Sequence, residues 1–362
     1  MLNRIIHWSI QNKLIVAVLT LGIIVWGLFS LSKLPIDAVP DITNNQVQIV
    51  TVSPSSGAED IERFVTFPVE QSMATTPGIE EIRSFSRFGL SVVTIVFTEE
   101  TDIYWARQQV LERLSDAKAS IPPGYGDPFL APLSTGLGEI YQYTLKAKPG
   151  FSKKFTPTEL RTIQDWIIRR QLLGVKGVAD VSSFGGNVKT YEIAIDPFLL
   201  KSNGITLSDV FQAIERNNQN TGGAYIERNS MTTYIRTEGL IQSLTDIENI
   251  QVKHSESAMP VYIRDVAKVE FGKAVRYGAL TYNTDGEAVG GIVLMLKGAN
   301  SSEVIHLVKE KMAQIESNLP EGVELNVYLD RTDLVDRAIS TVTKNLIEGA
   351  LIVIFVLVLL LG

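Results

Sequence analysis

Apolar residues are distributed unevenly along the chain, and two long uncharged stretches lie near its ends. The first runs from Leu14 to Ser32 without an ionisable side chain, and the second begins at Gly349 and continues to Gly362. A helix rises about 1.5 Å per residue, so roughly 20 apolar residues cross a bilayer core of about 30 Å. We therefore predict a cytoplasmic N-terminus and a first membrane helix within residues 1–33, and the truncated start of a second membrane helix within residues 331–362.

Charges beside the first stretch predict its orientation. Arg4 and Lys13 precede the stretch and no acidic residue occurs before Asp37, whereas cytoplasmic flanks of membrane helices are enriched in Lys and Arg. The N-terminus is therefore expected in the cytoplasm, and the residues after Lys33 on the far side of the membrane. A cleaved signal peptide would have a shorter apolar run and a small-residue cleavage pattern, and no such pattern precedes Pro35.

Between the two stretches, the spacing of apolar residues is typical of strands in some segments and of helices in others. Alternating residues predict a strand over Gln46–Ser53, and three-to-four spacing predicts an amphipathic helix over Asp102–Ser120. A helix is also expected over residues 57–75, where Pro68 should kink it or limit its first turns. With two strands between residues 79 and 97, the order is β-α-β-β-α-β, that of a ferredoxin-like unit.

The same order recurs further along the chain. The segment that begins at Gly177 matches the one that begins at Gly78, and Leu319–Gly322 matches Ile121–Gly124 at twice that offset. The second copy is therefore longer than the first, which predicts an insertion within it. The expected organisation is an α+β membrane protein with a first unit at 34–133, a second unit at 134–184 and 274–330, and an inserted α+β domain at 185–273.

The predicted insertion contains a short helix and a hairpin. The helix is expected over Thr206–Asn217, and the hairpin strands over Ala224–Ile226 and Thr232–Arg236, around Arg228-Asn229-Ser230. A long polar arm of this kind suits contact with another protein. An ordinary surface hairpin is the alternative interpretation.

Composition excludes several classes of function. The net charge of −7 comes from interspersed acids and bases, so nucleic acid is not an expected partner. The chain has no cysteine, which excludes disulfides and thiolate metal sites. No phosphate-binding loop pattern is present, and the glycine-rich pieces Phe184-Gly185-Gly186 and Thr221-Gly222-Gly223 are interpreted as turns. We expect neither a catalytic residue nor a cofactor in this chain.

Histidines do not predict a metal site. His7 precedes the membrane helix, His254 is expected in a loop and His306 on an amphipathic helix. None of the three has a second histidine three or four residues away, so each is interpreted as a solvated or interfacial side chain.

Methionines divide into two groups. Met73, Met295 and Met312 fall on apolar faces and are expected in the core. Met231 and Met259 are expected to be exposed. They could ligate a soft cation only if several thioethers converged, and the sequence does not predict such convergence.

Acidic residues supply weaker signals. Asp37 and Asp41 could attract cations at an entrance beside the membrane, although a solvated linker is the simpler interpretation. Glu348 lies at the edge of the second apolar stretch, where it can reach water. Three acids precede that stretch at helical spacing and are interpreted as favourable charges at a helix N-terminus: Asp330, Asp333 and Asp336.

Several motifs together resemble one family. The segment Leu34–Ile49, LPIDAVPDITNNQVQI, is similar to the corresponding segment of resistance-nodulation-division (RND) efflux pumps of the heavy-metal branch, the CzcA and CusA type. Further motifs share this resemblance: Phe67-Pro68-Val69-Glu70, Phe88-Gly89-Leu90-Ser91, Ala106-Arg107-Gln108-Gln109-Val110 with Glu112-Arg113-Leu114, and Ser134–Tyr143, STGLGEIYQY. The resemblance covers all 362 residues and corresponds to the N-terminal third of such a pump.

This resemblance implies a fold and a function. The two repeated units would be porter subdomains and the insertion a docking subdomain, with the hairpin around Asn229 reaching into a neighbouring protomer of a homotrimer. The partners would be a periplasmic adaptor protein and an outer-membrane channel. The protein would exchange protons for heavy-metal cations at the bacterial inner membrane, with most of this chain in the periplasm.

The family's proton-relay carboxylates and metal-binding methionines belong to later segments of a complete pump. We therefore assign no metal ligand and no proton carrier to these residues. Two alternatives remain at this point. One is an RND exporter of organic drugs or lipids, and the other is a membrane-anchored interaction protein that does not transport, if the chain ends at Gly362.

Overall fold

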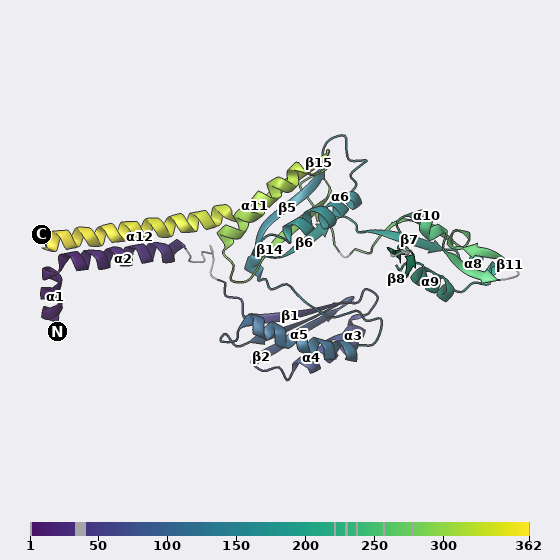
Figure 1. Ribbon diagram of the computed structural model, residues 1–362, viewed down its shortest axis with the longest axis horizontal. Helices are drawn as coiled ribbons and strands as arrows, with labels where there is room; N and C mark the ends of the chain where they lie inside the picture. The colour runs from purple at the N-terminus through teal and green to yellow at the C-terminus, as the bar shows by residue number, and fades with distance from the viewer. Residues whose placement is uncertain are drawn as a thin grey trace.

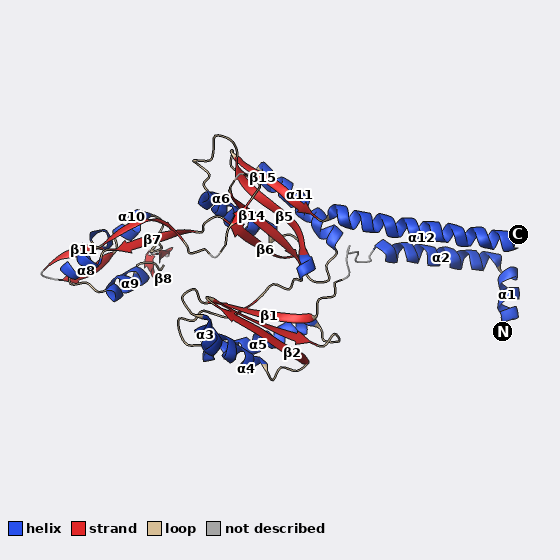
Figure 2. Cartoon of the chain, turned by 180° about the vertical axis from the view of Figure 1, so that it is seen from behind, coloured by secondary structure: helices blue, strands red, loops and turns tan. Residues whose placement is uncertain are grey.

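The protein is elongated and carries its apolar helices at one end. The structure is a computed structural model that describes residues 2–32, 41–220, 222–228, 231–236, 238–255, 258–276, 278–284 and 286–361. Helices α2 (Lys13–Ser32) and α12 (Thr332–Leu361) lie side by side in both views (Figures 1 and 2), and two sheets separate them from an inserted unit at the far end. Among the described residues, Asp336–Leu360 alone is long and apolar enough to cross a membrane, while Lys13–Gly27 is a shorter apolar stretch.

The first sheet has the strand order β2-β3-β1-β4, and all neighbours are antiparallel. Its strands are β1 (Asn45–Val52), β2 (Ile79–Arg87), β3 (Leu90–Phe97) and β4 (Phe129–Leu130). Helices cover one face, namely α3 (Ala58–Ile61), α4 (Phe67–Met73) and α5 (Ile103–Ser120) (Figure 1). Strand β1 follows the predicted alternation, since Val47 and Ile49 are buried against these helices. The Asp102 carboxylate caps α5 by accepting a hydrogen bond from the Trp105 amide at 2.8 Å.

The helix expected over residues 57–75 is continuous but irregular. A π-helical segment, η1 (Glu62–Thr66), joins α3 to α4, and Pro68 is among the first residues of α4. Inside a continuous helix a proline lacks the N–H for a backbone hydrogen bond and crowds the preceding turn. The irregular turn therefore lies immediately before the proline, with its buried side chains toward the sheet.

The second sheet repeats this arrangement with the order β6-β14-β5-β15. Its strands are β5 (Glu139–Ala147), β6 (Val178–Gly185), β14 (Glu287–Met295) and β15 (Val323–Asp330), and the short β13 (Leu280–Thr281) also pairs with β14. Its helices are α6 (Pro157–Ile163), π-helical η3 (Gln164–Ile168), α7 (Arg169–Leu172) and α11 (Ser301–Ser317). The predicted recurrence of β-α-β-β-α-β order is therefore confirmed, and each sheet buries its own hydrophobic cluster.

The chain leaves the second sheet after β6, forms the inserted unit, and returns to the sheet at β13. Its axis is the antiparallel pair β7 (Lys189–Ile195) and β12 (Ala267–Lys273), which pairs along its whole length. The other elements are α8 (Pro197–Ser202), α9 (Leu207–Arg216), β8 (Gly222–Arg228), β9 (Met231–Arg236), α10 (Leu244–Glu248), β10 (Gln251–Ser255) and β11 (Ala258–Tyr262). Helix α9 confirms the predicted helix, and Thr206 forms its N-terminal capping box with Asp209. The hairpin is β8–β9, while residues 229 and 230 lie outside the described residues.

One matched pair of glycines tests how the repeat is packed. Gly124 and Gly322 lie in the turns that follow the equivalent helices α5 and α11, with nearly the same φ, 98° and 99°. A side chain at either position would adopt a strained backbone, but only at Gly322 would its Cβ also meet Phe151, about 2.5 Å from Cγ. We expect Gly124→Ala to destabilise by about 1 kcal/mol and Gly322→Ala by about 1–3 kcal/mol more. Comparison of the unfolding midpoints of the two variants checks this, and equal losses would contradict it.

Candidate functional site

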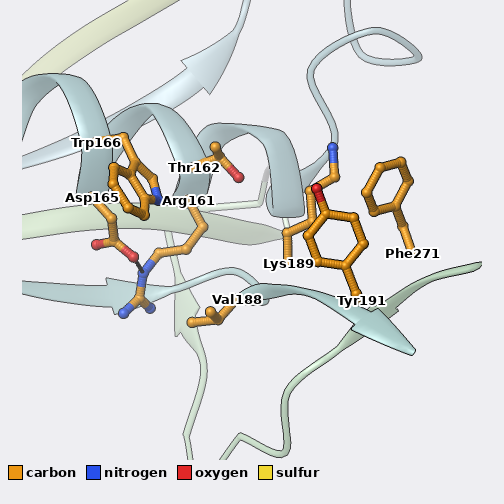
Figure 3. A pocket seen from close by; sticks show the side chains of 8 residues that line it. All are labelled: Arg161, Thr162, Asp165, Trp166, Val188, Lys189, Tyr191 and Phe271. Atoms are coloured by element: carbon orange, nitrogen blue, oxygen red, sulfur yellow. Dashed lines mark hydrogen bonds and ion pairs between the residues drawn. The ribbon is translucent and has the colours of Figure 1, made fainter. Parts of the chain in front are cut away.

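A cleft of about 280 Å³ lies where the inserted unit joins the second sheet. One wall comes from α6 and η3, and the other from β7 and β12 (Figure 3). The lining residues are Arg161, Thr162, Asp165, Trp166, Val188, Lys189, Tyr191 and Phe271. Because the cleft contains residues from both sides of the junction, its shape depends on how the inserted unit is held.

Arg161 is the central contact of this cleft. Its Nε donates to the Asp165 carboxylate at 2.8 Å, and one terminal nitrogen donates to the Gly185 carbonyl at 2.8 Å. Arg161 and Asp165 are one helical turn apart, and their side chains are only 19% and 27% exposed. The guanidinium therefore ties the helix to the carbonyl at which the chain leaves β6, through hydrogen bonds to a charged group.

The backbone at this exit is tightly packed. Gly185 and Gly186 have positive φ values of 69° and 63°, and a Cβ on Gly186 would lie 2.5 Å from the Pro157 carbonyl oxygen. A Cβ on Gly185 would clash with the Ala288 carbonyl oxygen. We predicted a turn at this glycine pair; Gly185 is the last residue of β6, Gly186 forms the bend after it, and neither position has room for a Cβ atom.

The opposite wall is aromatic, and its charges are paired. The Lys189 ammonium lies 3.0 Å from Glu159 and 4.3 Å from the centroid of the Phe271 ring. Tyr191 packs on Phe271 with ring centroids 5.4 Å apart. Trp166 is 61% exposed at the mouth of the cleft. These groups suit packing and recognition, and none of the cleft residues forms a nucleophile-and-base pair.

Each repeated unit also contains a buried polar contact beneath its π-helical segment. In the second unit, the Tyr143 hydroxyl donates to Gln164 Oε1 at 2.9 Å, and Gln164 Nε2 donates to Ser183 Oγ at 3.3 Å. Burial raises the pKa of Tyr143, so the phenol remains a neutral donor. In the first unit, Thr66 makes 2.7 Å contacts with both Ser86 and Ser91. Sequence reasoning missed these contacts because no local pattern predicts a π-helical turn.

A second junction joins the sheet to the long apolar helix. Strand β15 ends at Asp330 and α12 begins at Thr332, so a single residue separates them. The Asp330 carboxylate accepts hydrogen bonds from Lys309 Nζ at 2.7 Å and from the Thr332 amide at 2.8 Å. Arg331 donates to the Leu137 carbonyl. The end of β15 and the start of α12 are therefore joined without a loop and held by these hydrogen bonds.

A family model described as the AcrB/AcrD/AcrF family matches residues 5–362. The chain belongs to this family. The resemblance to RND pumps of the heavy-metal branch is thereby confirmed, because the similar curated proteins carry names of that branch. The chain spans about a third of the length of the curated relatives it matches.

Three relatives illustrate the degree of similarity. Protein HelA of Legionella pneumophila is 48% identical over 364 residues, covering 100% of this chain and 34% of that protein. The cobalt-zinc-cadmium resistance protein CzcA of Cupriavidus metallidurans is 46% identical, with the same two shares. The crystal structure of a heavy metal efflux pump, crystal form II, superposes with a TM-score of 0.83 at 35% identity and covers 96% of this chain and 34% of that one.

The structure places the histidines of this family member apart. His7 lies on α1 (Leu2–Gln11) and His306 on α11, where it is exposed and 3.6 Å from Glu310. The prediction that His254 lies in a loop is wrong, because this residue belongs to β10, which pairs with β11. The short strand was missed because its alternation spans only a few residues. No cluster of three or more His, Cys, Asp or Glu that could hold a metal ion occurs in the described part of the chain.

The methionine predictions are confirmed. Met73, Met295 and Met312 are at most 5% exposed, within the two sheet cores. Met231 and Met259 are 72% and 87% exposed and belong to different hairpins, β8–β9 and β10–β11. The two exposed thioethers therefore belong to separate hairpins.

The acidic residues have separate environments. Asp37 and the side chain of Asp333 lie outside the described residues. Asp41 accepts a hydrogen bond from the Thr43 amide at 3.0 Å. Burial alone would raise the pKa of this carboxyl, but hydrogen bonds from Thr43 and Thr135 and the positive charge of Lys297 outweigh burial and lower the pKa. Asp336 is exposed on α12, and Glu348 is exposed 3.9 Å from Lys344.

The contacts of Arg161 predict a cost for its removal. We expect Arg161→Gln to destabilise the junction by about 1–3 kcal/mol, because Asp165 and the Gly185 carbonyl lose a charged donor. Local opening should then accelerate subtilisin cleavage within residues 185–189 by about tenfold. Lys176→Gln is the matched control, since its ion pair with Glu303 is 84% and 54% exposed and should contribute little. Equal cleavage rates in the two variants would exclude a holding role for Arg161.

The contacts of Asp330 predict a pH dependence. Burial alone would raise the pKa of Asp330, but hydrogen bonds from Lys309 and Thr332 outweigh burial and lower it below 3.8. A carboxyl with a lowered folded pKa contributes stability above its unfolded pKa, and loses this contribution as the pH falls through the folded value. The difference in unfolding midpoint between the wild type and Asp330→Asn should therefore be constant above about pH 5 and shrink at more acidic pH.

Asp127→Asn is the control for this experiment, because the Asp127 side chain is 88% exposed and lies 3.6 Å from Lys118. Its midpoint should stay close to that of the wild type across the same pH range. A difference for Asp330→Asn that does not shrink in acid would show that the carboxylate charge is not what stabilises the β15–α12 junction.

Proposed function

We propose that this chain is the N-terminal part of a proton-driven transporter that exports heavy-metal cations across the bacterial inner membrane, and that it is not an enzyme. The observation that carries the proposal is similarity over the whole chain to proteins named for cation efflux, at 47% identity for CzcA of Alcaligenes and 39% for CusA of Escherichia coli. The N-terminus would be cytoplasmic and most of the chain periplasmic, as the charges around α2 predict.

The repeated sheets suit the role of porter subdomains. Residues 34–133 would form the first, and residues 134–184 with 274–330 the second, while 185–273 would form the docking subdomain. Two independent hydrophobic clusters support rigid units of this kind, since each sheet packs on its own helices. Alternating access would then proceed by rigid-body shifts of the units at junctions such as the Arg161 cleft. The direct connection of β15 to α12 would link these shifts to the membrane.

The hairpin β8–β9 supports the proposal of a homotrimer. Its strands pair with each other, and the described residues of β8 are all exposed, including Tyr225 at 59%. On β9, Tyr234 is 80% exposed and packs on Tyr225 with ring centroids 6.5 Å apart. A two-stranded ribbon is marginally stable in water by itself, so this arm gains stability by inserting into a neighbouring protomer. A periplasmic adaptor and an outer-membrane channel would complete the assembly.

Metal resistance tests the function directly. A sensitised strain that expresses the full-length protein containing this chain should tolerate higher concentrations of at least one salt of zinc, cobalt, cadmium, copper or silver than the same strain without it. Tolerance of dyes and detergents should not change. The matched control is the same strain with the β8–β9 hairpin removed by joining Asn220 to Gly239 through a short glycine linker, which should abolish the gain if trimer formation is required.

Two results would contradict the proposal. Protection against dyes or detergents without protection against any metal salt would make the protein an exporter of organic compounds. Absence of any protection, together with a native product close to the 39.9 kDa of this chain, would make it a membrane-anchored interaction protein.

A further inference from the structure

Helix α1 is a separate element that turns away from α2. It spans Leu2–Gln11, and both views show it lying across the end of α2 (Figures 1 and 2). The change of direction occurs at Asn12, whose backbone N–H and side-chain Nδ2 both donate to the Trp8 carbonyl, at 2.9 and 3.0 Å. Helix α2 begins at the next residue, Lys13. The turn is therefore held by local hydrogen bonds and does not depend on contacts with the sheets.

The two sides of α1 differ in polarity. In the sequence of α1, polar residues recur at helical spacing, namely Asn3, Arg4, His7 and Gln11, and most of the intervening positions are Leu2, Ile5, Ile6, Ser9 and Ile10. His7 and Gln11 are linked by a 3.2 Å hydrogen bond on the polar side. Ile10 is 60% exposed, and Trp8, at the boundary between the sides, is 48% exposed. The described apolar side chains of α1, Trp8 and Ile10, are thus each about half exposed.

Because α1 directly precedes α2, the surroundings of α2 indicate what covers the apolar side of α1. Helix α2 is apolar around its circumference, and Leu14, Val18 and Leu19 are 80%, 66% and 57% exposed, so the bilayer proposed to surround α2 begins where α1 ends. With ten residues, α1 is about 15 Å long, too short to cross a bilayer. Basic residues near its ends and the absence of any acid before Asp37 favour a surface of anionic headgroups.

We propose that α1 is an interfacial helix that lies along the bilayer surface at the N-terminal end of α2. Its apolar side contacts the acyl-chain boundary, its polar side contacts phospholipid headgroups, and Trp8 occupies the interface where amphipathic rings are favoured. This inference rests on the proposed membrane location of α2. Such a helix fixes the depth of α2 in the bilayer, because a sharp turn at Asn12 prevents the chain from sliding along its axis.

Site-directed spin labelling tests this placement. The chain contains no cysteine, so single labels can be introduced at Ile6→Cys, Ile10→Cys, His7→Cys and Gln11→Cys in the full-length protein, with any cysteine beyond these 362 residues replaced. The protein is reconstituted in vesicles of phosphatidylethanolamine and phosphatidylglycerol. Accessibility of each label to oxygen, which enriches in lipid, is compared with accessibility to a water-soluble nickel chelate.

The expected result is an oxygen-to-nickel ratio at residues 6 and 10 that exceeds the ratio at residues 7 and 11 by about fivefold or more. A label at Leu19→Cys, on α2, serves as the control for a position deep in the bilayer. Ratios at 6 and 10 as low as those at 7 and 11, with Leu19→Cys still buried in lipid, would overturn the inference but leave the membrane location of α2 intact. Labels at 6 and 10 that neither reagent reaches would also overturn it, because protein would then cover this side.

Nickel access at Leu19→Cys would instead contradict the membrane location of α2 and, with it, the proposed function. Folding of each labelled protein is checked by its elution as a single species in detergent. A second pair of variants provides a test independent of labels. Ile10→Glu should reduce the resistance that the protein confers, since a charge on the apolar side opposes contact with acyl chains, whereas Gln11→Glu on the polar side should have a smaller effect.

Discussion

The hydrogen bonds of the Arg161 guanidinium fix the end of β6, the strand from which the chain passes into the inserted unit. The inserted unit is joined to the second sheet by only two chain crossings, and at the first of them Arg161 holds the carbonyl of Gly185. A half-buried cation is stable there because Asp165 neutralises it within the same helix. The inserted unit is itself tied to the second unit by the ion pair between Lys189 of β7 and Glu159 of α6, at 3.0 Å. Nearby aromatic packing, Tyr191 on Phe271, gives the junction an apolar wall but no fixed direction.

The two repeated units share one topology but contain different buried polar contacts. Both have the same strand order and both contain a π-helical segment above the sheet. In the first unit the segment ends in Thr66, which contacts serine hydroxyls, and in the second it begins with Gln164, which accepts from Tyr143. A polar group buried in a hydrophobic core is costly unless it is paired, so these contacts favour one register of helix on sheet. Each unit is therefore packed around its own polar contact as well as its own hydrophobic cluster.

The membrane end of the chain carries few charges of its own. Helix α12 follows β15 without a loop. Asp330, the last residue of β15, contacts Lys309. Within the described residues, no three His, Cys, Asp or Glu side chains are grouped so that they could hold a metal ion. Fold and family membership by themselves do not specify the chemistry of a cargo. What this third of the protein contributes is a scaffold: two repeated units, an arm and a rigid connection to the membrane.

Local patterns in the sequence determined the apolar stretches, the repeated β-α-β-β-α-β order, the core methionines and the family, because hydrophobic period and short motifs depend on neighbouring residues only. They also predicted the bend at Gly186, but the interpretation of Gly222-Gly223 as a turn is wrong, because β8 begins at Gly222. They did not predict that β10 contains His254, nor the π-helical turns at Glu62–Thr66 and Gln164–Ile168. Short strands and single irregular turns have too few residues to leave a period.

The tertiary structure alone decided which distant residues meet. Arg161 and Gly185 are 24 positions apart in the sequence but are hydrogen-bonded. Val188 and Phe271 lie near the two ends of the inserted unit in the sequence, yet both line the same cleft. Such contacts depend on sheet order and on where an insertion leaves and re-enters a unit, and these are properties of the whole chain. Periodicity records which face of an element is buried, but it does not record which element covers that face. For this reason the sequence predicted the parts of the protein, and the fold determined its junctions.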